Sequence, residues 1–106
     1  MSAAARIGDS EAGGCDLGLD CCPHNRAGTN TEASENVFIN GRGAHRKGDT
    51  GSCNCPHGGT FVTVGGSASV LINGRAATRI GDGTACQACG QGGIHTTGSN
   101  NVFIGG

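Results

Sequence analysis

The 106-residue sequence has no tryptophan and no tyrosine, three phenylalanines and two prolines. Large apolar side chains are therefore scarce, and the chain can build only a small hydrophobic core. A small core buries too little surface to offset chain entropy easily. Such domains therefore usually need additional stabilisation, for example by disulfides or a bound metal ion. The apolar residues are clustered along the chain, which argues against the disorder that a glycine-rich, aromatic-poor composition otherwise suggests.

The sequence also lacks an excess of positive charge and a long apolar run. Its formal net charge is −1 and its pI is near 6.4, so there is no basic stripe to neutralise phosphates, and we expect no nucleic-acid binding. No segment approaches 18 consecutive apolar residues, so we expect no stable membrane insertion. The N-terminus lacks a charged stretch followed by an apolar one, so we expect synthesis in the cytoplasm, no Sec signal peptide and export by another route.

Signatures of catalysis are lacking as well. The glycine-rich stretches contain no phosphate-binding loop, and no serine has the context of a nucleophile elbow. A cysteine–histidine dyad such as Cys22 with His24 is conceivable, but the repeat described below explains both residues better. We therefore predict that the protein is not an enzyme.

Cysteine, by contrast, is abundant, with seven residues. An odd number leaves one thiol outside any closed disulfide framework. In a reducing cytosol thiols more often bind metal than pair, which favours a metal site. Two alternatives stay open: a disulfide such as Cys22–Cys55, and plain loop thiols at Cys15, Cys21, Cys22 and Cys86.

One pattern occurs three times along the chain. In each copy a histidine or cysteine stands 13 residues before a valine; the pairs are His24 and Val37, His57 and Val70, and Cys89 and Val102. His24, His57 and Cys89 thus occupy one equivalent position in three copies. We expect them to converge near an approximate three-fold axis.

Each copy contains a short apolar run with strand-forming residues. The runs are Val37, Phe38 and Ile39; Val70, Leu71 and Ile72; and Val102, Phe103 and Ile104. Asn40-Gly41 and Asn73-Gly74 follow two of them, and Asn-Gly is the strongest short signal of a tight hairpin. The pattern predicts strand, turn, short strand and glycine-rich loop in each copy. Because no copy can bury its run alone, we predict one small, glycine-rich, all-β domain with internal pseudo-three-fold symmetry.

Between the hairpins, the segment Asn-Gly-x-x-Ala-x-Arg-x-Gly-Asp recurs, and its copies end at Asp49 and Asp82, with a shortened copy ending at Asp9. Gly-Ser-x-x-Val-Phe/Leu-Ile begins at Gly66 and again at Gly98. These motifs resemble those of PAAR-repeat proteins, the spike-tip proteins of type VI secretion systems and contractile phage tails. The resemblance covers nearly the whole chain, although all three copies lack the proline that gives the family its name.

The resemblance implies a small conical β domain whose blunt base sits on a trimeric spike protein, of the VgrG type or a phage baseplate spike. The implied function is structural: the protein caps and sharpens the spike and helps it pierce the target cell envelope. It would be a monomer by itself, would bind the spike through its three apolar runs, and would leave the cell by contractile injection or on a phage tail. Effector proteins are further expected partners, and residues 1–106 are expected to form a single PAAR-repeat domain without an effector extension.

The family also implies a zinc ion near the sharp tip, held by three histidines and one cysteine. By position, His24 and His57 match family histidines and Cys89 matches the family cysteine, while the third histidine has no counterpart. Zinc takes four nitrogen or sulfur ligands in a structural site. Cys55 is the expected fourth ligand, because it lies two residues before His57 and so faces the same side of an extended strand. The open alternatives for this ligand are Cys53, Cys22, Cys86 and His95, and iron is the alternative metal.

Two histidines do not occupy the repeated position that holds His24, His57 and Cys89. His45 falls within the four residues that correspond to Pro-Ala-Ala-Arg in the family, and we expect it at the surface or base of the domain. His95 is expected to face solvent. A second functional hypothesis is a soluble zinc- or thiol-responsive binding module in which the thiols act as the sensor. A disulfide-stapled extracellular toxin is a third.

Overall fold

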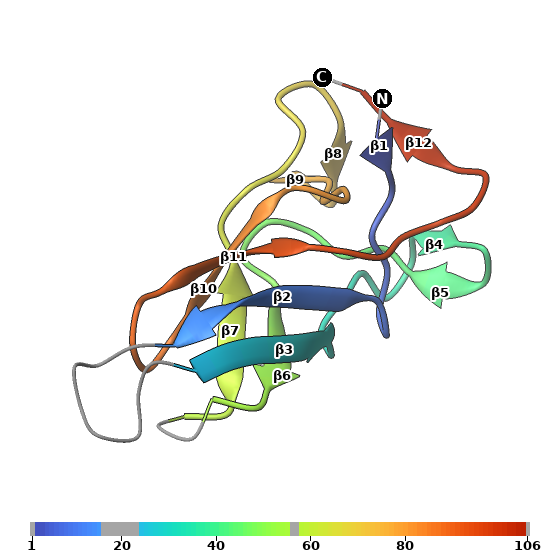
Figure 1. Ribbon diagram of the computed structural model, residues 1–106. Helices are drawn as coiled ribbons and strands as arrows, with labels where there is room; N and C mark the ends of the chain where they lie inside the picture. Colours follow the sequence, from blue (N-terminus) through green and yellow to red (C-terminus); the bar gives the residue numbers. More distant parts are fainter. Residues whose placement is uncertain (1, 16–23, 56–57, 106) are drawn as a thin grey trace.

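The computed structural model describes residues 2–15, 24–55 and 58–105, and these form an all-β structure (Figure 1). Six strands close into an antiparallel barrel in the order β10-β11-β2-β3-β6-β7. They are β2 (Ser10–Cys15), β3 (His24–Asn30), β6 (Thr50–Cys53), β7 (Thr60–Thr63), β10 (Gly83–Cys86) and β11 (Gly92–His95). The predicted all-β class is confirmed. The expected glycine-rich loops are wrong in part, because these segments supply most of the barrel strands.

Three small two-stranded sheets gather at one end of the barrel (Figure 1); we call them the three hairpins, although the third pairs the first strand with the last. They pair β4 (Phe38–Ile39) with β5 (Arg42–Gly43), β8 (Leu71–Ile72) with β9 (Arg75–Ala76), and β1 (Ser2–Ala3) with β12 (Phe103–Ile104). Asn40 and Gly41 have φ of 56° and 77°, and Asn73 and Gly74 have 54° and 79°. Positive φ at both positions is the type I′ geometry that the Asn-Gly pairs predict. The third hairpin joins the two ends of the chain and so completes the third copy.

A ring of backbone hydrogen bonds marks the pseudo-three-fold axis. The amide of Ala5 donates to the carbonyl of Thr78 at 3.0 Å, His45 donates to Ala5 at 3.1 Å, and Thr78 donates to His45 at 3.1 Å. These three residues occupy the same position in the three copies, and each is buried. The ring therefore ties the copies together with one bond from each.

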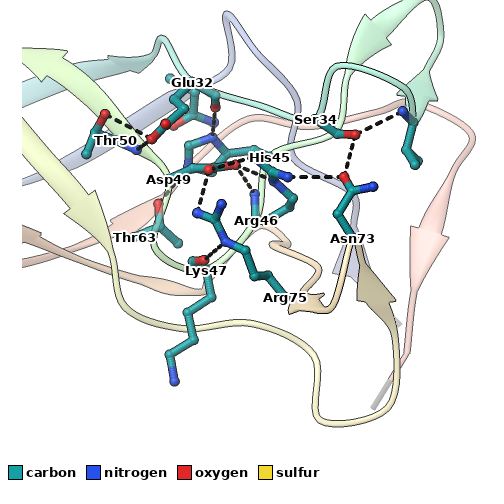
Figure 2. Close-up of polar contacts among 12 residues, drawn as sticks. Glu32, Ser34, His45, Arg46, Lys47, Asp49, Thr50, Thr63, Asn73 and Arg75 are labelled. Atoms are coloured by element: carbon teal, nitrogen blue, oxygen red, sulfur yellow. Dashed lines mark hydrogen bonds and ion pairs between the residues drawn. The ribbon is translucent and has the colours of Figure 1, made fainter.

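The Arg-x-Gly-Asp segments form turns closed by the same contacts in each copy. The Arg46 amide donates to Asp49 Oδ2 at 2.9 Å, and its guanidinium pairs with the same carboxylate at 2.8 Å. Figure 2 shows Arg75 reaching this carboxylate from the neighbouring hairpin, with Nη2 to Oδ1 at 2.6 Å. Burial alone would raise the pKa of Asp49, but the hydrogen bonds from Arg46 outweigh it and lower the pKa. Each turn is thus fixed within its copy, and at Asp9 and Asp49 a second arginine, Arg42 or Arg75, links the turn to a neighbouring hairpin.

Two separate clusters form the interior at opposite ends of the molecule, which measures 41 × 24 × 23 Å. The cluster under the hairpins consists of three alanines and three isoleucines: Ala4, Ala44, Ala77, Ile39, Ile72 and Ile104. The cluster at the other end consists of cysteines. Between them lies a buried polar region that includes His45, Thr63, His95, Glu11 and Arg26. In the described part of the chain no helix is long and apolar enough to cross a membrane.

Candidate metal centre

Four cysteines from three segments meet at the end of the barrel away from the hairpins. Cys15 ends β2, Cys55 follows β6, Cys86 ends β10 and Cys89 lies in the turn after β10. Their sulfur atoms all lie within 4.8 Å of one another. Three of them are buried and Cys89 is partly buried. The segments are far apart in sequence, so only the closed barrel brings the four thiols together.

The turn from Cys86 to Cys89 has the local geometry of a metal-binding knuckle. The Cys89 amide donates to Cys86 Sγ at 3.5 Å, and the Gly90 amide donates to the Cys86 carbonyl at 2.8 Å. Gly90 has a φ of 75°, which closes the turn. Burial raises the pKa of the Cys86 thiol, but hydrogen bonds from the Cys89 and Ala88 amides and from neighbouring thiols outweigh it and lower the pKa to about 6. The turn therefore favours the thiolate form of Cys86, which is the form that binds metal.

The donor set fits a tetrahedral metal ion. A zinc–sulfur bond of about 2.3 Å gives sulfur–sulfur separations of about 3.8 Å in a tetrahedron, and the observed set lies within 4.8 Å. Four sulfur ligands are typical of zinc or iron sites. The residues present therefore could hold a metal ion as four thiolates, with their protons released on binding.

The structure places the predicted ligands as follows. Cys55 and Cys89 belong to the four-cysteine cluster. Cys86 was predicted from the sequence only as an alternative ligand, and Cys15 was not predicted as a ligand. His57 and the side chain of His24 lie outside the described residues, so the set His24, His57, Cys55 and Cys89 stays a prediction. A tetrahedral ion accepts four ligands, and the two sets are alternatives that share Cys55 and Cys89.

The remaining cysteines lie near or outside this cluster. Cys53 is partly buried and packs against the cluster without being one of the four. Burial raises the pKa of its thiol. Cys21 and Cys22 lie outside the described residues, and with them the proposed Cys22–Cys55 disulfide; the five described cysteines are free thiols.

The expected surface positions of His45 and His95 are wrong, because both side chains are fully buried. His45 Nδ1 lies 2.7 Å from the carbonyl oxygen of Glu32, an acceptor, so this nitrogen carries the proton. His45 Nε2 then accepts from the hydroxyl of Thr63 at 2.7 Å, and the Thr63 oxygen accepts from His95 Nε2 at 2.9 Å. Figure 2 shows the part of this hydrogen-bond network that runs from Glu32 through His45 to Thr63. The sequence missed it because the glycine-rich strands carry no apolar alternation that would reveal their inner face.

The apolar runs lie at the opposite end of the molecule from the cysteines. The middle residue of each run is exposed: 60% for Phe38, 63% for Leu71 and 51% for Phe103. The last residue of each run is buried in the core under the hairpins; these are Ile39, Ile72 and Ile104. Val37 and Val102 are partly buried against that core, and Val70 is 37% exposed.

The family model described as the PAAR motif matches residues 22–89 and residues 55–106. A comparison with curated proteins finds no match. The two family matches together cover well over half of the chain, and their repeated register agrees with the pseudo-three-fold ring and hairpins described above. PAAR proteins form a structural family of spike-tip-associated domains of contractile injection systems, linked to VgrG-type spikes and to secreted or phage-tail components. The chain therefore belongs to the PAAR-motif family.

Proposed function

We propose that the protein caps a trimeric β-helical spike of a contractile injection machine, sharpens it, and helps it pierce the target envelope. The three hairpins form the base that contacts the spike. The end that carries the cysteines forms the free tip. One pseudo-three-fold monomer would sit on one three-fold trimer, with three equivalent patches meeting three equivalent chain ends.

The observation that carries this proposal is the set of exposed apolar residues at the base. Phe38, Leu71 and Phe103 are each more than half exposed, and each comes from a different hairpin. Three large apolar side chains that repeat around one axis at one end of a monomer are typical of a docking surface. The buried isoleucines behind them hold the hairpins in place, so the exposed side chains form a preformed surface.

The tip needs a separate source of stability. The cluster at this end consists of cysteines, so there is little apolar surface to hold the loops against mechanical load. We propose that one zinc ion, bound by Cys15, Cys55, Cys86 and Cys89, pins the three segments together; iron is the alternative metal. A structural zinc site contributes folding free energy on the order of 10 kcal/mol in small peptides, which is comparable to the whole stability of a small domain.

The first prediction tests the base. The triple variant Phe38→Glu, Leu71→Glu, Phe103→Glu should lose binding to a trimeric spike protein by at least 100-fold, because three buried charges would oppose docking. Binding is measured by calorimetry with a VgrG-type trimer, with an expected stoichiometry of one chain per trimer. The matched control is Ile94→Glu, since Ile94 is 51% exposed on the barrel wall. Equal loss of binding in the control, or full binding by the folded triple variant, would contradict the proposal.

A further inference from the structure

A fully buried arginine lies directly beneath the cysteine cluster. Arg26, on β3, is 1% exposed, and its carboxylate partner Glu11, on β2, is also 1% exposed. Arg26 Nη2 lies 2.8 Å from Glu11 Oε1, and its Nε lies 3.3 Å from Oε2. Arg26 Nη2 also donates to the Thr84 hydroxyl oxygen at 3.1 Å, and this hydroxyl in turn donates to Glu11 Oε1 at 2.7 Å. The ion pair is therefore fully satisfied inside the barrel.

The free edge of this guanidinium joins two of the three segments that carry the cysteines. Arg26 Nη1 donates to the carbonyl of Gly14, the residue before Cys15, at 2.9 Å. It also donates to the carbonyl of Gln91 at 2.9 Å. The same Gln91 carbonyl accepts from the Cys86 amide at 3.0 Å, so it closes the Cys86–Cys89 turn. One nitrogen thus links the end of β2 to the base of the knuckle.

The charge of Arg26 also bears on the cluster. Burial lowers its pKa, but the hydrogen bonds and charge of Glu11 outweigh burial and raise it, and negative charge at Cys86 and Cys53 acts in the same direction. A four-thiolate site with a divalent ion carries a net charge of −2. Arg26 with Glu11 forms a neutral pair, so removal of either partner changes the charge beneath the site by one unit, in opposite directions.

We propose that Arg26, held in place by Glu11, is the positioning residue of the metal centre: it fixes the segments of Cys15 and of Cys86 and Cys89 in register for one tetrahedral ion. The inference rests on the proposed four-cysteine site. No ligand atom comes from Arg26 itself; it acts through the two carbonyls that it binds. Mutation of a residue that holds metal ligands in place in this way typically lowers metal affinity by about 10- to 100-fold.

The test compares three variants with the wild type and one matched control. Arg26→Gln removes the charge and the hydrogen bonds that link Gly14 to Gln91. Arg26→Lys keeps the charge but loses the planar guanidinium that binds Glu11 and the two carbonyls at once. Glu11→Gln removes the negative charge that balances Arg26. The control is Arg46→Gln, since Arg46 forms a comparable ion pair with Asp49 in a turn of the hairpin end. The probes are Co²⁺, whose thiolate charge-transfer bands report affinity, and iron, whose reduction potential reports local charge.

Arg26→Gln and Arg26→Lys should lower Co²⁺ affinity by about 10- to 100-fold, while Arg46→Gln lowers the melting temperature without changing Co²⁺ affinity. The iron potential should shift to more negative values in Arg26→Gln and to more positive values in Glu11→Gln, because added positive charge favours the reduced, more negative centre. Should Arg26→Gln fail to fold, Arg26→Lys and Glu11→Gln carry the test.

Two outcomes overturn the inference alone: wild-type affinity and potential in the Arg26 variants, or the same affinity loss in Arg46→Gln as in Arg26→Gln. A wild-type protein that binds Co²⁺ without thiolate bands overturns the four-cysteine site itself. The two failures are therefore distinguishable.

Discussion

At the scale of single residues, the interior is unusual for its neutral histidines. The hydrogen-bond chain from the Glu32 carbonyl through His45 and Thr63 leaves His95 Nδ1 as a bare lone pair. In the described part of the chain this buried nitrogen has no hydrogen-bond partner. A second proton there would place a charge in a site with no acceptor assigned to it, so both rings are held neutral.

This arrangement predicts acid lability. Burial and the neighbouring His45 lower the pKa of His95 to about 4, although the charges of Glu11, Asp82 and Asp9 act in the opposite direction; burial also lowers the pKa of His45. The unfolded chain therefore binds more protons than the folded one between about pH 6.5 and pH 4, and stability falls as the pH is lowered through this window. For His95 the loss is on the order of 3 kcal/mol. Urea unfolding at several pH values measures it.

The control for this prediction is His95→Gln, whose amide can still donate to Thr63. Subtracting its pH profile from that of the wild type cancels the titration of the cysteines, which both proteins share. The difference should be flat above about pH 7 and should change steeply between pH 6.5 and 4. Parallel profiles across the whole range would show that His95 is not the group responsible.

At the scale of elements, the sequence predicts the hairpins better than the barrel. Asn-Gly turns and strand-forming runs have local causes, and the structure confirms both turns. The barrel strands are rich in glycine, and they pair with strands that are distant in the sequence. The sequence pattern within one repeat therefore predicts loops in place of these strands. Phe61 explains part of this composition, because it is fully buried where Gly28 and Gly51 leave room for its ring.

A substitution at one of these glycines tests that reason. In Gly51→Ala the new Cβ would overlap the Phe61 ring and the Thr29 carbonyl oxygen. Overpacking of this kind typically costs about 1–3 kcal/mol, and we expect thermal or urea unfolding to show a loss in this range. Gly92→Ala is the matched control in another barrel strand, where the nearest heavy atom would be the Thr84 oxygen at 3.8 Å. Similar stability changes in the two variants would mean that strand propensity, not the space around Phe61, sets the cost.

The residues of the metal centre also differ in whether a local sequence pattern could predict them. The Cys86-x-x-Cys89 spacing was visible in the sequence, but it lacked a second pair. Cys15 could have been found from the repeat, since Cys15 and Cys55 each stand six residues after the aspartate of an Arg-x-Gly-Asp segment. Aligning the repeats on the apolar runs instead selects His24, His57 and Cys89 as the equivalent residues. The positions of His45, His95 and Arg26 had no such signal, because only the closed barrel defines its inner face.

At the scale of the whole molecule, stability resides at two ends that differ in kind. The hairpin end has an apolar core, a ring of backbone bonds and paired arginine turns, whereas the other end has cysteines. Removal of metal should therefore open one end only. This separation follows from the elongated shape, since local opening is governed by the contacts within each region.

We expect the native protein to contain one zinc ion per chain, and chelation to lower its melting temperature. Hydrogen exchange after chelation should rise at residues 13–15 and 86–91, while the amides of Ala5, His45 and Thr78 keep their protection, because their ring bonds do not depend on the tip. Cys15→Ser should reproduce the effect of chelation in both measurements. If His24 and His57 complete the site in place of Cys15 and Cys86, Cys15→Ser keeps its zinc and His24→Ala loses it. Uniform loss of protection at both ends on chelation would instead mean that the metal holds the whole fold together, and the base would then owe its shape to the tip.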